Sequence, residues 1–155
     1  MNELWLGSPA ESADYVFLLP NKPELPPNVL TKDLTNTDVS TLIEVNGNHW
    51  RKIFTIMAKL VAPDGSAWRE FRDNDLLKVV GLAFSVDQIQ HVKSIVFIVG
   101  KTFDAVYPVS AQAELIGEKH QAKVNLPYVW CPYLDYRQFP NSLIDALREC
   151  ILEKK

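Results

Sequence analysis

Three short apolar runs, each stopped by a proline or a glycine, most constrain the fold of this 155-residue chain. They are residues 15–19 before Pro20, residues 95–99 before Gly100, and residues 128–131 before Pro132. Continuous apolar runs of this length are typical of strands that are buried on both faces, as in parallel sheets covered by helices. The runs therefore predict an α/β domain with a buried sheet.

Amphipathic segments predict the helices that cover this sheet. One follows Asn48, a candidate N-cap, and its apolar side chains recur every three or four positions: Trp50, Ile53, Phe54, Met57, Leu60 and Val61. Another begins at Asn141 or Ser142 and has Leu143, Ile144, Leu147 and Ile151 on one face. Strands alternating with helices predict a three-layer α/β/α sandwich with a central, mostly parallel sheet of about four strands. Ligands are then expected beyond the carboxyl ends of the strands.

Shorter patterns predict the remaining elements. Asp38 is a candidate N-cap for a short helix, and further helical turns are expected over residues 76–80 and 101–107. Residues 113–116 and 121–126 are expected to be short strands that pair as a hairpin.

Composition narrows the class of protein. With 47% apolar and 23% charged residues, the chain reads as one globular domain over residues 1–155. Its net charge of −3 lacks the basic excess of a sequence-independent nucleic-acid binder, so any such contact would be local. Cys131 and Cys150 form neither a disulfide framework nor a zinc motif. Without a signal peptide or a membrane-length apolar run, a cytoplasmic protein with no membrane contact is expected.

Several common catalytic motifs are absent or incomplete. Gly100-Lys101-Thr102 follows a strand like the end of a phosphate-binding loop, but Ile95 stands where that loop needs a glycine. His49, His91 and His120 have no metal-ligand spacing, and no serine or cysteine lies in a nucleophile elbow. We therefore expect no metal and no cofactor.

Four segments carry a family resemblance when they are taken in order. Leu19-Pro20-Asn21-Lys22-Pro23 follows the first strand, Asn46-Gly47-Asn48-His49-Trp50 opens the amphipathic helix, Val99-Gly100-Lys101 ends the central strand, and WCPYLDYRQFP runs from Trp130 to Pro140. Together they resemble the uracil-DNA glycosylase superfamily, in particular its mismatch-specific and thymine-DNA glycosylase branch. The resemblance covers about residues 14–152.

The resemblance implies a glycosylase-like protein that binds a nucleobase or DNA. Asn21 would be the catalytic residue, because its amide would position a water or the edge of the base, although an amide does not titrate and is no general base. The implied substrate-binding residues are Asn48, His49, Gly100, Lys101, Tyr133, Leu134 and Arg137.

The resemblance also assigns separate tasks to some of these residues. Tyr133 and Leu134 would form a wedge that takes the place of a flipped nucleotide, and Arg137 would bind a flanking phosphate. Phe17 or another aromatic residue would stack on the base.

Departures from the family's pattern keep other functions open. The Asn21 loop lacks the glycines that let backbone approach a base, and Asp135 would repel phosphate, so base excision would be weak or lost. The alternatives are a non-catalytic interaction module on the same fold and a small-metabolite enzyme. The discriminating feature is a possible basic rim of Lys22, Arg51, Lys52, Lys101 and Arg137, set against the acidic Glu24, Asp104 and Asp135.

Overall fold

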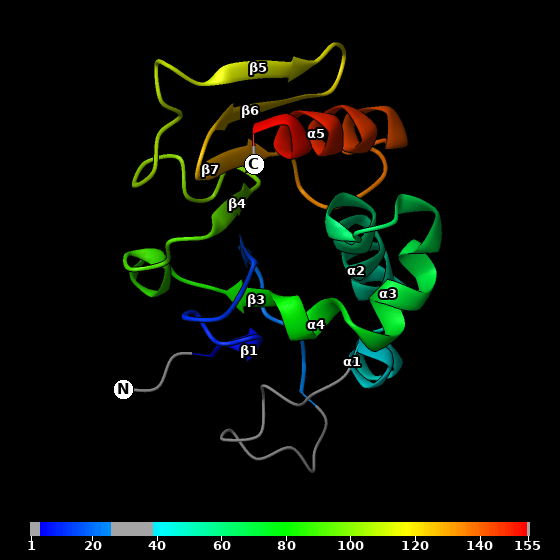
Figure 1. Cartoon of the computed structure of the whole chain (residues 1–155). Coiled ribbons are helices and arrows are strands. Elements are labelled where there is room, and N and C mark those ends of the chain that lie inside the picture. Colours follow the sequence, from blue (N-terminus) through cyan, green and yellow to red (C-terminus); the bar gives the residue numbers. More distant parts are fainter. Residues whose placement is uncertain (1–3, 26–38, 155) are drawn as a thin grey trace.

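A computed structural model describes residues 4–25 and 39–154, and these residues form one mixed sheet with its helices (Figure 1). The strands are β1 (Leu6–Gly7), β2 (Tyr15–Leu18), β3 (Val80–Ala83), β4 (Ile95–Val99), β5 (Glu114–Gly117), β6 (Gln121–Asn125) and β7 (Tyr128–Cys131). The helices are α1 (Val39–Asn46), α2 (Asn48–Val61), α3 (Trp68–Asn74), α4 (Leu76–Val79) and α5 (Asn141–Lys154), with two 3-10 helices, η2 (Gly65–Ala67) and η3 (Val86–Ile89).

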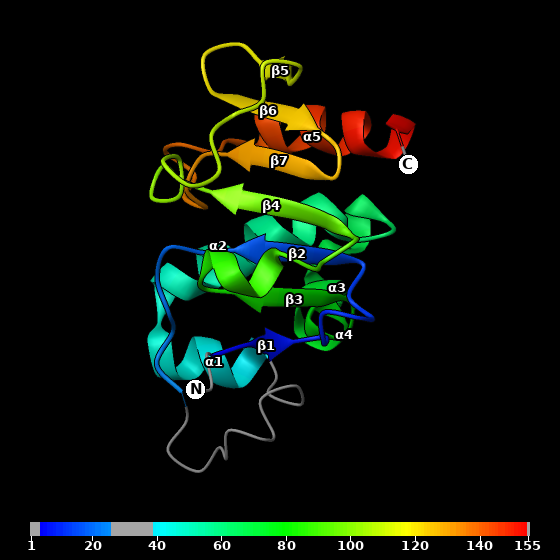
Figure 2. The same cartoon turned by 90° about the vertical axis from the view of Figure 1, so that its left-hand side faces the viewer.

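The sheet has seven strands in the order β1-β3-β2-β4-β7-β6-β5 (Figure 2). Strands β3, β2, β4 and β7 are parallel to one another, whereas β1, β6 and β5 pair antiparallel with their neighbours. The expected α/β class is correct, but the expected sheet of about four mostly parallel strands is wrong. The count was too low because β1 has only two residues, β3 follows a helix directly, and the β5–β6 hairpin continues the same sheet.

Alternate residues of the central strands face two different layers. Tyr15, Phe17 and Phe97 point toward the helices, and the rings of Phe17 and Phe97 stack with centroids 4.4 Å apart. Val16 and Leu18 point to the other face, into a smaller apolar cluster. Burial on both faces explains why these strands read as continuous apolar runs.

The two faces are covered unequally. Residues from all five α-helices contribute to the larger apolar cluster, and Figure 1 shows these helices on one side of the sheet. In the described part of the chain, the other face is covered by η3 and by side chains such as Phe103 and Tyr107. Residues 101–107 form hydrogen-bonded turns where a short helix was expected. The second helical layer of the predicted α/β/α sandwich is therefore not formed by α-helices in the described residues.

Strand β3 replaces part of an expected helix. Helix α4 ends at Val79, and Val80 adopts an extended backbone that pairs with Tyr15 of β2. Gly81 lies beside β1, where a Cβ atom would come within 2.5 Å of the Trp5 ring. Residues 80–83 have no strand pattern of their own. They form a strand because they pair with β2 on one side and with β1 on the other.

Two other expectations for helices and strands are correct. Helix α2 spans the predicted apolar stripe, and the β5–β6 hairpin forms with Gln121 opposite Gly117. Helix α2 begins differently from the prediction, because Gly47 is its N-cap, with φ 81°, and Asn48 is its first residue. The candidate cap Asp38 lies outside the described residues. None of the described helices is long and apolar enough to cross a membrane.

Candidate functional site

The loops after β2 and β4 leave the sheet toward opposite faces. These strands are parallel neighbours at the centre of the sheet. Leu25, in the loop after β2, packs with the helix-face cluster, whereas Phe103, after β4, packs with the cluster on the other face. A reversal of this kind leaves a crevice at the carboxyl ends of the two strands, which is where open α/β sheets bind ligands.

A pocket of about 650 Å³ lies at this edge of the sheet. Pro20 follows β2, Gly100 and Lys101 follow β4, and Cys131 and Tyr133 end and follow β7. The pocket is large enough for a drug-sized molecule. Gly100 has φ 75°, and a Cβ atom there would meet nothing within 4 Å, so the backbone is accessible at this turn.

Beside the pocket, three side chains from distant segments form one hydrogen-bonded chain. The Tyr133 hydroxyl lies 2.7 Å from His49 Nε2 and donates to Asn21 Oδ1 at 3.1 Å. Because the hydroxyl has a single proton, His49 Nε2 must be the donor in the first bond. The donor-to-acceptor direction therefore runs from His49 through Tyr133 to Asn21 Oδ1. Because the oxygen of the Asn21 amide faces Tyr133, its nitrogen points away from the tyrosine hydroxyl.

Local structure places each member of this chain. Asn46, at the end of α1, holds the loop after β2 because it accepts from the Glu24 backbone N–H and donates to the Glu24 carbonyl, at 2.8 and 2.9 Å. Gly47 supplies the positive φ that joins α1 to α2, so His49 lies in the first turn of α2. Tyr133 follows β7 by two residues and packs its ring against the large apolar cluster.

Burial sets the protonation of the groups at this edge. Burial raises the pKa of Tyr133, and the Asp135 carboxylate adds to that rise. Burial alone raises the pKa of the Cys131 thiol, which therefore stays protonated at neutral pH. Cys131 is thus unsuited to act as a nucleophile.

The structure brings together five of the predicted site residues. Asn21, His49 and Tyr133 are hydrogen-bonded, and Tyr133 shares the pocket with Gly100 and Lys101. Asn48, Leu134 and Arg137 do not line the pocket.

Leu134 is fully buried in the helix-face core, so it is not available as an exposed wedge. Phe17 is fully buried too and stacks on Phe97, so it cannot stack on a base.

Asn48 and Arg137 remain at the surface. Asn48 Oδ1 accepts from the Arg51 guanidinium at 3.1 Å. The backbone N–H of Arg137 donates to Asp135 Oδ1 at 2.9 Å, which closes a turn in the loop after β7. Neither residue lines the pocket.

Sequence reasoning missed two polar residues of the pocket. Gln121 and Lys123 lie on β6, and both line it. The alternation of exposed Gln121 and Lys123 with buried Ala122 and Val124 is a strand signal that could have placed them on one face. Their proximity to β4 and β7 depends on the order of strands in the sheet.

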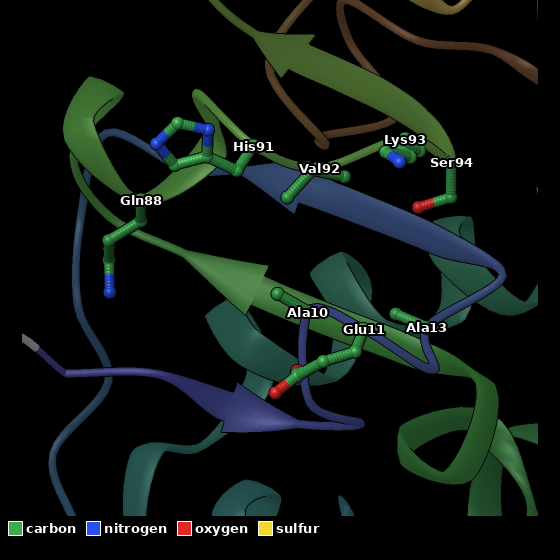
Figure 3. A pocket seen from close by; sticks show the side chains of 8 residues that line it. All are labelled: Ala10, Glu11, Ala13, Gln88, His91, Val92, Lys93 and Ser94. Atoms are coloured by element: carbon green, nitrogen blue, oxygen red, sulfur yellow. The ribbon is translucent and has the colours of Figure 1, made fainter.

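A second pocket of about 690 Å³ lies at the opposite end of the strands (Figure 3). Ala13 precedes β2 and Ser94 precedes β4, so this pocket is at their amino ends. The Gln88 amide there is already used, because it accepts from Phe84 and Ser85 and donates to Leu4. The buried Ser94 hydroxyl has no partner among the described residues. Among the described residues that line this pocket, there is no hydrogen-bonded cluster comparable to His49–Tyr133–Asn21.

The site at the carboxyl edge offers hydrogen bonding and positive charge. In the described part of the chain, no group of three or more histidine, cysteine or carboxylate side chains could hold a metal ion. The Asn21 amide can orient a ligand, and Lys101 and Lys123 can bind an anion.

Neither the curated proteins nor the solved structures include a match to this chain. A family model does match residues 5–152, and the chain therefore belongs to a family of unknown function, DUF6942.

Proposed function

We propose that the protein binds a nucleobase at the carboxyl edge of its sheet, as a glycosylase-like protein whose base-excision activity is weak or lost. The observation that carries the proposal is the hydrogen-bonded chain of His49, Tyr133 and Asn21 beside a pocket at the crossover between β2 and β4. These three residues come from three of the four segments that resemble the glycosylase superfamily.

The polarity of this chain favours a particular group on the ligand. Because Asn21 Oδ1 accepts from Tyr133, the amide nitrogen is the atom left for a ligand, and it has no partner among the described residues. An amide N–H donor pairs with a carbonyl acceptor, such as those of uracil, thymine, cytosine and guanine. His49 and Tyr133 would hold the amide in this orientation.

Weak or absent catalysis is proposed for a chemical reason. An amide cannot take a proton from water, and no carboxylate of the described residues is hydrogen-bonded to Asn21. Any hydrolysis would rely on positioning the water and on stabilising the departing base.

Calorimetric titration of the full chain with uridine tests the binding step. We expect saturable binding that Asn21→Ala removes, and that Tyr133→Phe weakens because the orientation of the amide is lost. Asn74→Ala, an exposed asparagine on α3, is the matched control and should bind like the wild type. Failure of every nucleoside to bind would reject the proposal in favour of an interaction module.

Duplexes carrying uracil or a G·T mismatch, incubated with the protein and then cleaved with alkali, test the catalytic step. We expect little or no strand cleavage at high protein concentration. Rapid cleavage that Asn21→Ala abolishes would show that base excision is retained.

A further inference from the structure

In the described structure, the loop that follows β7 has no exposed apolar side chain that could enter a base stack. Leu134 and Phe139 are fully buried, and the Tyr133 hydroxyl is hydrogen-bonded to His49 and Asn21. An enzyme that extracts a nucleotide from a duplex must offset the cost of unstacking, commonly with an inserted apolar side chain. Tyr136, another aromatic residue of this loop, is half-buried against the helix-face cluster, with the Lys59 ammonium 5.0 Å from its ring centroid. None of the apolar side chains of this loop is therefore fully exposed.

Hydrogen bonds within the loop also hold its shape. The backbone N–H of Asp135 donates to the Tyr133 carbonyl, and those of Gln138 and Phe139 donate to the Asp135 carbonyl, all at 2.8 or 2.9 Å. The Asp135 carboxylate accepts from the Arg137 backbone. Rearranging the loop to expose Leu134 would break these bonds and remove a core side chain from its cluster.

Two lysines with exposed side chains line the pocket. Lys101 follows β4 and Lys123 lies on β6, and among the described residues that line the pocket Asp104 is the one acidic residue. Neither lysine forms an ion pair within residues 4–25 and 39–154. Two lysine ammonium groups suit a single phosphate, which carries between one and two negative charges at neutral pH.

We propose that the ligand is a free nucleoside monophosphate, with its phosphate between Lys101 and Lys123 and its base directed toward Asn21. This inference rests on the proposed function, because it places the base at the same edge of the sheet. It adds a phosphate group to the proposed ligand, and it excludes duplex DNA as that ligand. Gly100 lines the same pocket, and a Cβ atom there would meet nothing within 4 Å, so the space at this turn is open to a ligand.

Calorimetric titrations of the full chain with uridine monophosphate, uridine, inorganic phosphate and a short duplex containing a G·U mismatch test the inference. We expect the monophosphate to bind most tightly, at least about tenfold more tightly than uridine, with an affinity that falls as salt rises. Lys101→Ala and Lys123→Ala should each weaken binding of the monophosphate about tenfold and weaken binding of uridine much less. Lys93→Ala, at the opposite end of the strands, is the matched control.

The outcomes separate this inference from the proposed function. Tighter binding of the duplex than of the monophosphate, or a monophosphate affinity unchanged in both lysine variants, would overturn the free nucleotide while leaving base binding intact. Inorganic phosphate binding as tightly as the monophosphate, with no binding of uridine, would overturn both. Melting temperatures of the variants, compared with that of the wild type, show whether each remains folded.

Discussion

Tyr133 and Leu134 are adjacent in the chain and have opposite surroundings. The Tyr133 hydroxyl reaches the candidate site, where it links His49 to Asn21, whereas Leu134 is fully buried among apolar side chains. The sequence predicts that the two residues form one wedge, but Tyr133 belongs to the candidate site and Leu134 to the core. The consequences of substituting the two residues should differ accordingly.

Leu134→Ala should destabilise the fold by about 2–5 kcal/mol, because it removes a buried side chain and leaves a cavity. Urea unfolding followed by circular dichroism measures this change in the free energy of unfolding. Tyr133→Phe, which keeps the ring and removes only the hydroxyl, is the comparison and should lose about 1 kcal/mol. A Leu134→Ala protein as stable as the wild type would show that Leu134 is not part of the core.

Strand β3 depends on close contact with the amino-terminal segment. Gly81 pairs with Gly7 of β1, and the Trp5 side chain lies over the same position. The Trp5 indole also donates to the Ser8 carbonyl at 2.7 Å, which fixes the ring on its own segment, and the Ser8 backbone N–H donates to the Val80 carbonyl at 3.0 Å, which ties the segment to β3. The absence of a side chain at Gly81 is what permits this approach.

Gly81→Ala should therefore be destabilising by about 1–3 kcal/mol, because a Cβ would lie 2.5 Å from the Trp5 ring and 2.7 Å from the Ser8 carbonyl oxygen. The change in Trp fluorescence and the shift of the thermal midpoint measure the effect. Gly65→Ala is a milder control, since its Cβ would approach no closer than 3.4 Å to the Arg148 side chain. Equal midpoints for Gly81→Ala and the wild type would contradict the packing of β1 against β3.

Three ionisable groups whose pKa is raised in the folded protein make the fold sensitive to alkali. Burial raises the pKa of Tyr107 on one face and those of Tyr133 and Cys131 at the carboxyl edge. Each group keeps its proton in the folded protein at a pH where the unfolded chain loses it. Their contribution to stability is therefore complete below the unfolded pKa values, about 9 for Cys131 and 10 for the tyrosines, and is lost as pH rises through the folded values.

The free energy of unfolding should consequently fall as pH rises above about 9. Urea titrations at a series of pH values between neutral and strongly alkaline measure this fall. Tyr107→Phe combined with Tyr133→Phe should make it shallower, because two of the groups no longer titrate. An unchanged dependence in the double variant would assign the alkaline loss to other groups.

The chain's local patterns were sufficient to predict much of the secondary structure. Strands β4 and β7, helix α2 and the β5–β6 hairpin all follow from apolar periodicity and from glycine or proline stops. These signals lie within a few neighbouring residues, so they can be read without knowing what the segment packs against. The resemblance also named Asn21, His49 and Tyr133, although it did not predict the hydrogen bonds between them.

Tertiary structure decided the features that depend on residues distant in the chain. Val80–Ala83 is a strand because β2 and β1 flank it, and Tyr133 is 84 positions from His49 and 112 from Asn21. Only the strand order brings Lys123 of β6 to the same pocket as Lys101. The partners in strand pairing and in core packing lie far apart in the sequence, so the neighbouring residues in the chain do not reveal them. For this reason the sequence did not show that Leu134 is a core residue and not an exposed wedge.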